Sequence, residues 1–233
     1  MKPTMTFSIL LFLGLALCNA QENKNPDQII KLLQDGNARF VSGAVVHPQQ
    51  GEARRMEVFE NGQAPFATVL SCSDSRGPVE LIFDQGIGDV FVVRVAGNIC
   101  GLSETASLEY AAEHLKIPLL IVLGHSKCGA VTAVVKEEKV HGSLPQLAAH
   151  IVPAVEKAKQ VQGKDFSDGL LHTSIEENVW HSIAEMLQSE IISELVQEGK
   201  IKVVGAFYDL HSGEVKWLGS HPAEKELLKS KHH

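Results

Sequence analysis

Hydrophobic residues along this chain gather in short uninterrupted runs, separated by longer stretches of mixed polarity. The runs lie at 66–70, 90–93 and 119–123. An apolar run without polar alternation predicts a strand that is covered on both faces, as in a parallel sheet. The mixed stretches predict helices at 26–42, 54–61, 78–84, 103–115, 128–136, 144–160 and 175–197. A further pair of strands is predicted at 202–208 and 214–218.

The predicted strands and helices alternate along the chain. Asn25 followed by Pro26 is typical of the start of a helix, and Ser103 is expected to cap a later one. No internal repeat or low-complexity linker divides the sequence. We therefore expect an α/β fold: a single domain with a central, mostly parallel β-sheet flanked by helices, and an N-terminal helical arm.

The first twenty residues have a different pattern from the rest. Lys2 precedes an apolar run over 7–17, and Ala20 is followed by polar residues. A basic start, a short apolar centre and a small residue at the end are typical of a secretory signal peptide. A membrane-spanning helix needs roughly 20 apolar residues, which this run does not reach. We expect a signal peptide over 1–20, a catalytic domain over 21–233, export to the periplasm or the medium, and no membrane association after cleavage.

Composition narrows the class of protein. Hydrophobic residues make up 44% of the chain and charged residues 21%, which is ordinary for a protein with a packed core. The net charge is −7, and no basic stripe is present, so nucleic acid is not an expected partner. Beyond the predicted signal the chain has three cysteines, Cys72, Cys100 and Cys128. Because three is an odd number, they cannot all form disulfides within one chain.

Chemically reactive side chains follow two of the predicted strands directly. Cys72-Ser73-Asp74-Ser75-Arg76 follows the first strand, and His125-Ser126-Lys127-Cys128 follows the third. Ligand sites in open parallel sheets lie beyond the carboxyl ends of the strands, so these two segments are expected to meet. Two thiolates and one imidazole suit Zn²⁺ with its fourth position open, as in a catalytic zinc site.

A disulfide between Cys72 and Cys128 is the strongest alternative, because an exported protein can form one. Asp74 and Arg76 favour the metal, since an arginine beside a ligand can hold a neighbouring carboxylate in place. Cys100 is expected to be a small packing residue.

These segments resemble a known family. Cys72-x-Asp74-Ser75-Arg76 followed by Gly124-His125-x-x-Cys128-Gly129 is similar to the β-class carbonic anhydrases. Further blocks resemble that family over roughly 26–219: Asn37-x-Arg39-Phe40-x-x-Gly43, Glu80-Leu81-Ile82-Phe83-Asp84, Arg94-x-Ala96-Gly97-Asn98, Ser107-Leu108-Glu109-Tyr110-Ala111 and Val203-Val204-Gly205-Ala206-x-Tyr208-Asp209.

The resemblance implies reversible hydration of CO2 to bicarbonate and a proton. It implies one Zn²⁺ per subunit, bound by Cys72, His125 and Cys128, with water in the fourth position. Asp74 and Arg76 are the implied catalytic pair: Asp74 orients the water, and Arg76 keeps Asp74 off the metal. In a closed, inactive state Asp74 itself becomes a zinc ligand.

The resemblance also implies a substrate site and an assembly. Gln63, Phe91, Tyr110 and the backbone of Gly129 are the implied substrate contacts. Gln63, together with Val69 where a regulated subset has tryptophan, points to the permanently open type. A homodimer or homotetramer is expected. Two alternatives stay open: a CS2 or COS hydrolase on the same fold, and a non-catalytic protein that binds zinc or bicarbonate.

Overall fold

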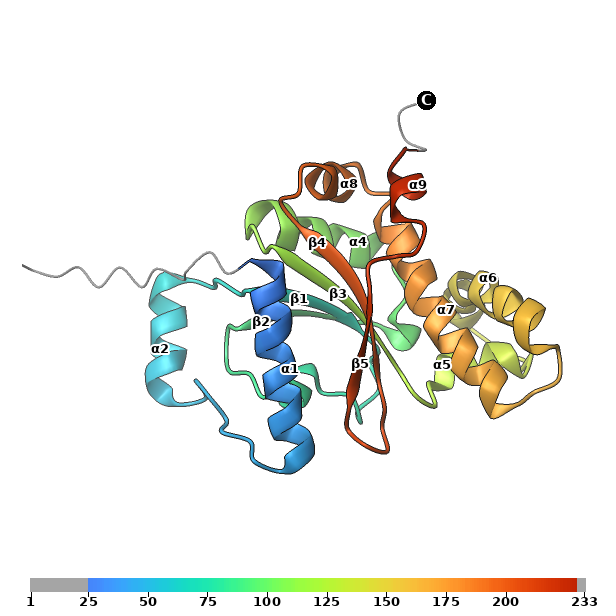
Figure 1. Cartoon of the computed structure of the whole chain (residues 1–233), viewed down its shortest axis with the longest axis horizontal. Helices are drawn as coiled ribbons and strands as arrows, with labels where there is room; N and C mark the ends of the chain where they lie inside the picture. Colours follow the sequence, from blue (N-terminus) through green and yellow to red (C-terminus); the bar gives the residue numbers. More distant parts are fainter. Residues whose placement is uncertain (1–24, 230–233) are drawn as a thin grey trace, which may run out of the picture.

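The computed structural model describes residues 25–229, so the expected signal peptide lies outside the described residues. Within the described range, none of the helices has the length and apolar character needed to cross a bilayer. The chain forms one α/β unit whose central sheet has helices on both faces (Figure 1). This architecture confirms the expected fold class, including the N-terminal helix.

The sheet has five strands in the order β2-β1-β3-β4-β5. The strands are β1 (Ala67–Ser71), β2 (Val90–Arg94), β3 (Leu119–His125), β4 (Lys202–Tyr208) and β5 (Val215–Gly219). The first four are parallel to their neighbours, whereas β5 pairs antiparallel with β4. From β1 the chain first adds β2 on one side and then crosses to add β3 on the other. The crevice between the ends of β1 and β3 is therefore the point where ligands bind in sheets of this kind.

Helices cover both faces of this sheet. They are α1 (Pro26–Ser42), α2 (Glu52–Asn61), α3 (Val79–Ile82), α4 (Leu102–Glu109), α5 (Gly129–Val135), α6 (Leu144–Gln162), α7 (Asp168–Met186), α8 (Glu190–Gln197) and α9 (Glu224–Lys229). A π-helical turn over Tyr110–His114 continues α4. In Figure 1, α1 lies in front of the sheet and α4 behind it.

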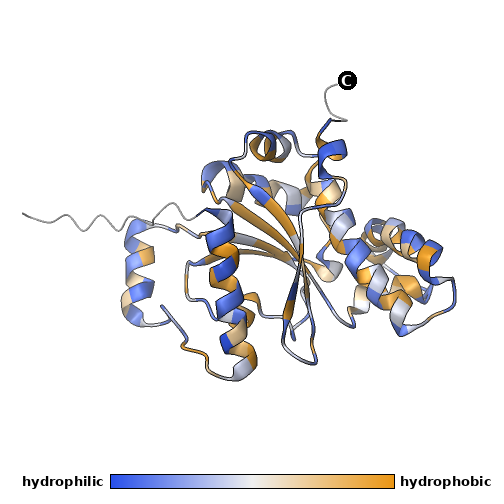
Figure 2. Cartoon of the chain, viewed as in Figure 1, coloured by the Kyte–Doolittle hydropathy of each residue, from blue (hydrophilic) through white to orange (hydrophobic). Residues whose placement is uncertain are grey.

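Side chains of the strands point alternately to these two layers. Val69 and Ile121 pack with Ile29 and Leu33 of α1, while Leu120 packs on the opposite face with α7 and α8. Both faces of β1 and β3 are thus buried, which explains their continuous apolar sequences. Figure 2 shows hydrophobic residues along the strands and polar residues on the outer side of α1.

Several helix boundaries differ from the prediction. The helix predicted over 175–197 is two helices, because Ser189 caps a new one: its hydroxyl accepts from the N–H of Ile192. The first of the two begins earlier than predicted, where Ser167 accepts from the N–H of Leu170. Ser103 lies inside α4 and is not its cap, since that helix begins after Gly101.

Two further differences concern short helices. The helix predicted over 78–84 is only the short α3, and residue Asp84 beyond it has a positive φ of 46°. The short α9 follows β5 and has no counterpart among the predicted elements. None of these differences moves the ends of β1 and β3, which position the site.

Candidate metal centre

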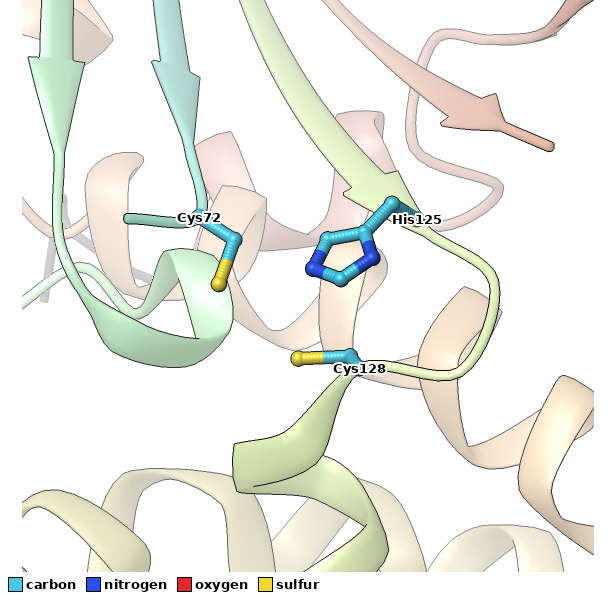
Figure 3. A group of neighbouring side chains, drawn as sticks. All are labelled: Cys72, His125 and Cys128. Atoms are coloured by element: carbon cyan, nitrogen blue, oxygen red, sulfur yellow. The ribbon is translucent and has the colours of Figure 1, made fainter. Parts of the chain in front are cut away.

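Three metal-binding side chains converge at the carboxyl ends of β1 and β3. Cys72 follows β1, His125 is the last residue of β3, and Cys128 immediately precedes α5. One ligand atom from each lies within 4.8 Å of the other two, and all three residues are buried. Figure 3 shows the two sulfur atoms and the imidazole turned toward a common point. Within residues 25–229 this is the one such group of metal-binding side chains.

The register of the sheet explains why the three side chains meet. Ser71 at the end of β1 lies opposite Leu123 of β3, so Cys72 follows β1 at the level of Gly124, next to His125. His125 therefore lies one position beyond the level of Cys72. After His125 the chain turns sharply at Lys127, whose φ is 54°. Hydrogen bonds to the end of β4 fix this turn: Ser126 N–H donates to the Tyr208 carbonyl, and Ser126 Oγ accepts from Leu210 N–H. The turn returns Cys128 to the same point.

The imidazole of His125 is oriented as a metal ligand. Its Nδ1 lies 2.9 Å from the Ser126 carbonyl oxygen, which is an acceptor only, so Nδ1 carries the proton. The lone pair is therefore on Nε2. That nitrogen is buried and has no hydrogen-bond partner within the described chain. A buried, unpaired acceptor is costly, and a metal cation between the two sulfurs is the partner that this geometry fits.

The pKa values of the two thiols are shifted in opposite directions. A hydrogen bond from the Cys128 thiol lowers the pKa of Cys72 against the opposing effect of burial, and the backbone N–H of Gly97 adds to the lowering. The same hydrogen bond, together with burial, raises the pKa of Cys128. Cys72 is thus the thiol that ionises more readily, and Cys128 would lose its proton on binding a metal ion.

None of the described cysteines forms a disulfide in this structure. Cys100 lies apart from the group, on the face of the sheet that α4 and α7 cover. Its thiol contacts Thr105 Oγ1, and burial raises its pKa to about 12. Cys100 is accordingly a packing residue with an unreactive thiol, as expected from the sequence.

Asp74 and Arg76 form a two-pronged ion pair beside the group. Arg76 Nε donates to Asp74 Oδ1 at 2.9 Å, and Arg76 Nη2 donates to Oδ2 at 2.7 Å. These bonds hold the pKa of Asp74 well below its usual range, so the carboxylate stays ionised. Asp74 Oδ2 lies 4.0 Å from His125 Nε2. The carboxylate is therefore beside the candidate metal position without a direct bond to the imidazole.

Arg94, at the end of β2, is a site residue to which the sequence analysis gave no role. Its Nε donates to the carbonyl of Cys72 at 2.9 Å, and its Nη2 donates to the carbonyl of Asp74 at 2.5 Å. Arg94 thus holds the segment that carries both a metal ligand and the carboxylate. It lay within one of the sequence blocks that resemble the family, but nothing in the block indicated that it acts on backbone carbonyls.

The four expected substrate contacts do not converge on one point as the three metal-binding side chains do. Phe91 and Tyr110 pack together on the β2 edge of the sheet, with ring centroids 6.2 Å apart, and Tyr110 is 45% exposed. Gln63 is exposed in the segment between α2 and β1, and Gly129 is the exposed first residue of α5 beside Cys128. In a single chain, therefore, Gln63 and Tyr110 remain open to solvent.

Comparison with known proteins agrees with this geometry. The family model described as carbonic anhydrase matches residues 67–215. A carbonic anhydrase of Mycolicibacterium smegmatis is 37% identical over 204 residues, which are 85% of this chain and 96% of that protein. Carbonic anhydrase 2 of Mycobacterium tuberculosis is 38% identical over 194 residues, 82% of this chain and 92% of that protein.

Solved structures show the same relationship. A β-carbonic anhydrase of the fungus Aspergillus fumigatus superposes with a TM-score of 0.68 at 30% identity, covering 75% of this chain and 85% of its own. A β-carbonic anhydrase of Sordaria macrospora, described as tetrameric, gives a TM-score of 0.67 at 27% identity, covering 83% and 98%.

Proposed function

This chain belongs to the β-carbonic anhydrase family, and on that basis we propose that it catalyses the reversible hydration of CO2 to bicarbonate and a proton. The proposed cofactor is one Zn²⁺ per subunit, held by Cys72, His125 and Cys128. The observation that carries the proposal is the buried, unpaired Nε2 of His125, which faces two convergent thiols.

The donor set suits zinc. Two sulfurs and one imidazole nitrogen are zinc ligands, and three protein ligands leave a fourth position open, as in catalytic zinc sites. Zinc, when bound, supplies a Lewis acid that makes water nucleophilic near neutral pH. Two thiolates offset its double positive charge and blunt this effect, so the surrounding residues have to orient the reactants.

Asp74 is the proposed orienting group. Its carboxylate is ionised and is the charged acceptor beside His125 Nε2, at 4.0 Å. Asp74 Oδ2 accepts a hydrogen bond from the attacking water and so directs the water's lone pair toward CO2. Arg76 holds both carboxylate oxygens, which prevents Asp74 from turning inward to bind the metal itself. Gln63 and the Gly129 N–H are proposed to bind substrate oxygen, and Phe91 and Tyr110 to line an apolar approach for CO2.

Stopped-flow measurement of CO2 hydration tests this proposal. The protein is assayed as prepared, after chelation and after readdition of zinc, and we expect activity only in the zinc-loaded samples. Cys128→Ala should lose both zinc and activity, whereas Cys100→Ala, a buried cysteine outside the site, should keep both. Absence of any zinc-dependent rate above buffer contradicts the proposal. Measurable turnover of COS or CS2 with no CO2 hydration supports the hydrolase alternative instead.

We also propose that the enzyme is a homodimer or homotetramer. Apolar side chains are exposed on α4, which contacts β2, and on α2: Leu102 is 89% exposed and Phe59 81%. The helix that carries Phe59, α2, has no buried residue in the single chain. A second copy packed there covers these side chains together with Tyr110, and encloses the proposed substrate approach.

Export is proposed on the pattern of residues 1–20 alone. Cell fractionation of the full chain and of a version that begins at Met followed by Gln21 tests it. The full chain should reach the periplasm or medium in a shortened form, and the truncated version should remain in the cytoplasm. Retention of the full chain in the cytoplasm at full length contradicts the proposal.

A further inference from the structure

The short segment that follows β2 contacts the metal centre through its backbone. Val95 N–H donates to the Ser71 carbonyl, and Ser73 N–H donates to the Val95 carbonyl, so the segment lies alongside the end of β1. Two residues further on, the Gly97 N–H donates to Cys72 Sγ at 3.3 Å. An amide of this segment therefore points at the sulfur of Cys72, one of the three proposed zinc ligands.

This segment has an unfavourable backbone conformation. Gly97 and Asn98 both have positive φ values, 72° and 44°. A side chain at position 97 would bring its Cβ to 2.8 Å from Ile151 Cδ1. For the non-glycine Asn98 the left-handed conformation is less favourable than the ordinary right-handed one. Such a conformation persists only where surrounding contacts hold it.

Helix α7 supplies those contacts. Asn178 Nδ2 donates to the Gly97 carbonyl at 2.7 Å, and Ser182 Oγ donates to the Asn98 carbonyl at 2.9 Å. The two side chains lie one turn apart on α7 and are buried. Together they fix the two carbonyls of the left-handed pair.

Asn178 is an expensive residue to bury at this position. Its side chain is fully buried, and its Oδ1 has no hydrogen-bond partner within the described residues. A buried amide oxygen without a partner loses its hydrogen bonds to water and gains none in return, so it destabilises the folded state. An apolar residue of the same size would avoid this cost, and the one hydrogen bond that Asn178 makes goes to Gly97.

We propose that Asn178 is a positioning residue for the metal thiolate of Cys72, acting through Gly97. By fixing the Gly97 carbonyl, Asn178 holds that residue so that its N–H stays aimed at Cys72 Sγ. A hydrogen bond to a ligating sulfur withdraws electron density from it, and so reduces how strongly the thiolate neutralises the metal. The inference rests on the proposed zinc function and adds a residue on α7 to it.

The test uses Asn178→Leu, which keeps a similar volume and removes the donor. Its matched control is Ser174→Ala on the same helix, because Ser174 is also buried and its Oγ has no partner in the described chain. Two properties are measured on the full protein: zinc affinity in competition with a chelator, and the thiolate-to-metal charge-transfer band of the Co²⁺-substituted protein. For Asn178→Leu we expect zinc affinity to fall about 10- to 100-fold, because Gly97 no longer holds Cys72 Sγ in its ligating position. We expect the band to shift, because the sulfur loses the hydrogen bond that withdraws electron density from it. For Ser174→Ala we expect neither change.

A band and an affinity in Asn178→Leu equal to those of the parent would overturn the role of Asn178. If Asn178→Leu fails to fold, Asn178→Ala takes its place, because it removes the donor to the Gly97 carbonyl without adding a long apolar side chain. It is expected to shift the band, and an unshifted band counts against the role. A parent protein with no thiolate–cobalt band at all refutes the proposed metal site itself, which is a separate result.

Discussion

At the scale of single residues, Arg76 determines which atoms the Asp74 carboxylate can reach. Both carboxylate oxygens accept from the guanidinium, and Arg76 Nη2 also contacts the Lys127 carbonyl at 3.4 Å. The guanidinium therefore ties Asp74 to the loop between two of the metal ligands. Without it, the carboxylate is free to rotate toward the metal and to occupy the position proposed for water.

For Arg76→Ala we accordingly expect CO2 hydration to fall about 100-fold while the zinc content stays at one per subunit. The metal content is measured by mass spectrometry on the same samples that are assayed. Arg76→Lys keeps the charge but not the two-pronged geometry, so it should be intermediate. Activity of Arg76→Ala near that of the parent, with zinc present, would refute the role given to this residue.

Some residues of the candidate site could be predicted from the sequence and others could not. Cys72, His125 and Cys128 were predictable, because their side chains are chemically distinctive and follow buried strands. Arg94 and Asn178 were not, because they act on backbone carbonyls. Every residue has a carbonyl, so no pattern of side chains shows which one a distant arginine or asparagine will contact.

At the scale of elements, a buried carboxylate holds the carboxyl end of the N-terminal helix and the segment that follows it. Asp84, just after α3, accepts from Arg39 of α1 at 2.6 Å and from the N–H groups of Val46 and His47. Burial alone would raise the pKa of Asp84, but these hydrogen bonds outweigh it and the pKa lies below the ordinary value. The ionised form is therefore the one that holds α1 and the segment after it in place.

Because the pKa of Asp84 is lower in the folded state, its contribution to stability is complete above the ordinary aspartate pKa of about 4 and is lost as the pH falls below it. Asp84→Asn should lower the free energy of unfolding at pH 7 by roughly 2 to 3 kcal/mol. The difference from the parent should narrow toward pH 3. Thermal unfolding of both proteins across this range checks the prediction, and a difference that does not change with pH contradicts it.

Secondary structure was predictable where burial and hydrogen bonding agree. Uninterrupted apolar runs located β1 and β3, because a strand covered on both faces needs no polar positions. The same pattern located β2, although this edge strand is only partly buried. The break between α7 and α8 was missed, since it depends on the Ser189 hydroxyl turning back to cap a helix rather than on any loss of hydrophobic residues. A serine within a helical pattern does not indicate by itself whether it lies inside a continuing helix or caps a new one.

For the whole molecule, the exposed residues around β2 bear on assembly. Leu102 is 89% exposed, so Leu102→Glu removes no contact within a single chain. If a second copy covers it, the buried charge opposes association. We therefore expect Leu102→Glu to move the molar mass in solution toward that of a monomer, as measured by light scattering.

Val161→Glu is the matched control, because Val161 on α6 is 73% exposed and lies outside the β2 edge. It should leave the molar mass unchanged. Equal masses for Leu102→Glu, Val161→Glu and the parent would show that the β2 edge is not the contact between copies.

The placement of Cys72 and His125 on neighbouring central strands has a thermodynamic consequence. These ligands come together only when β1 and β3 are paired in register, so an unfolded chain does not present the site. A ligand that binds only the native state shifts the folding equilibrium, by about 4 kcal/mol when its free concentration is a thousand times the dissociation constant. The unfolding temperature should therefore rise with free zinc in the parent and stay constant in Cys128→Ala. Differential scanning calorimetry at buffered zinc concentrations measures this, and in such a protein the supply of metal governs how much of the chain is folded.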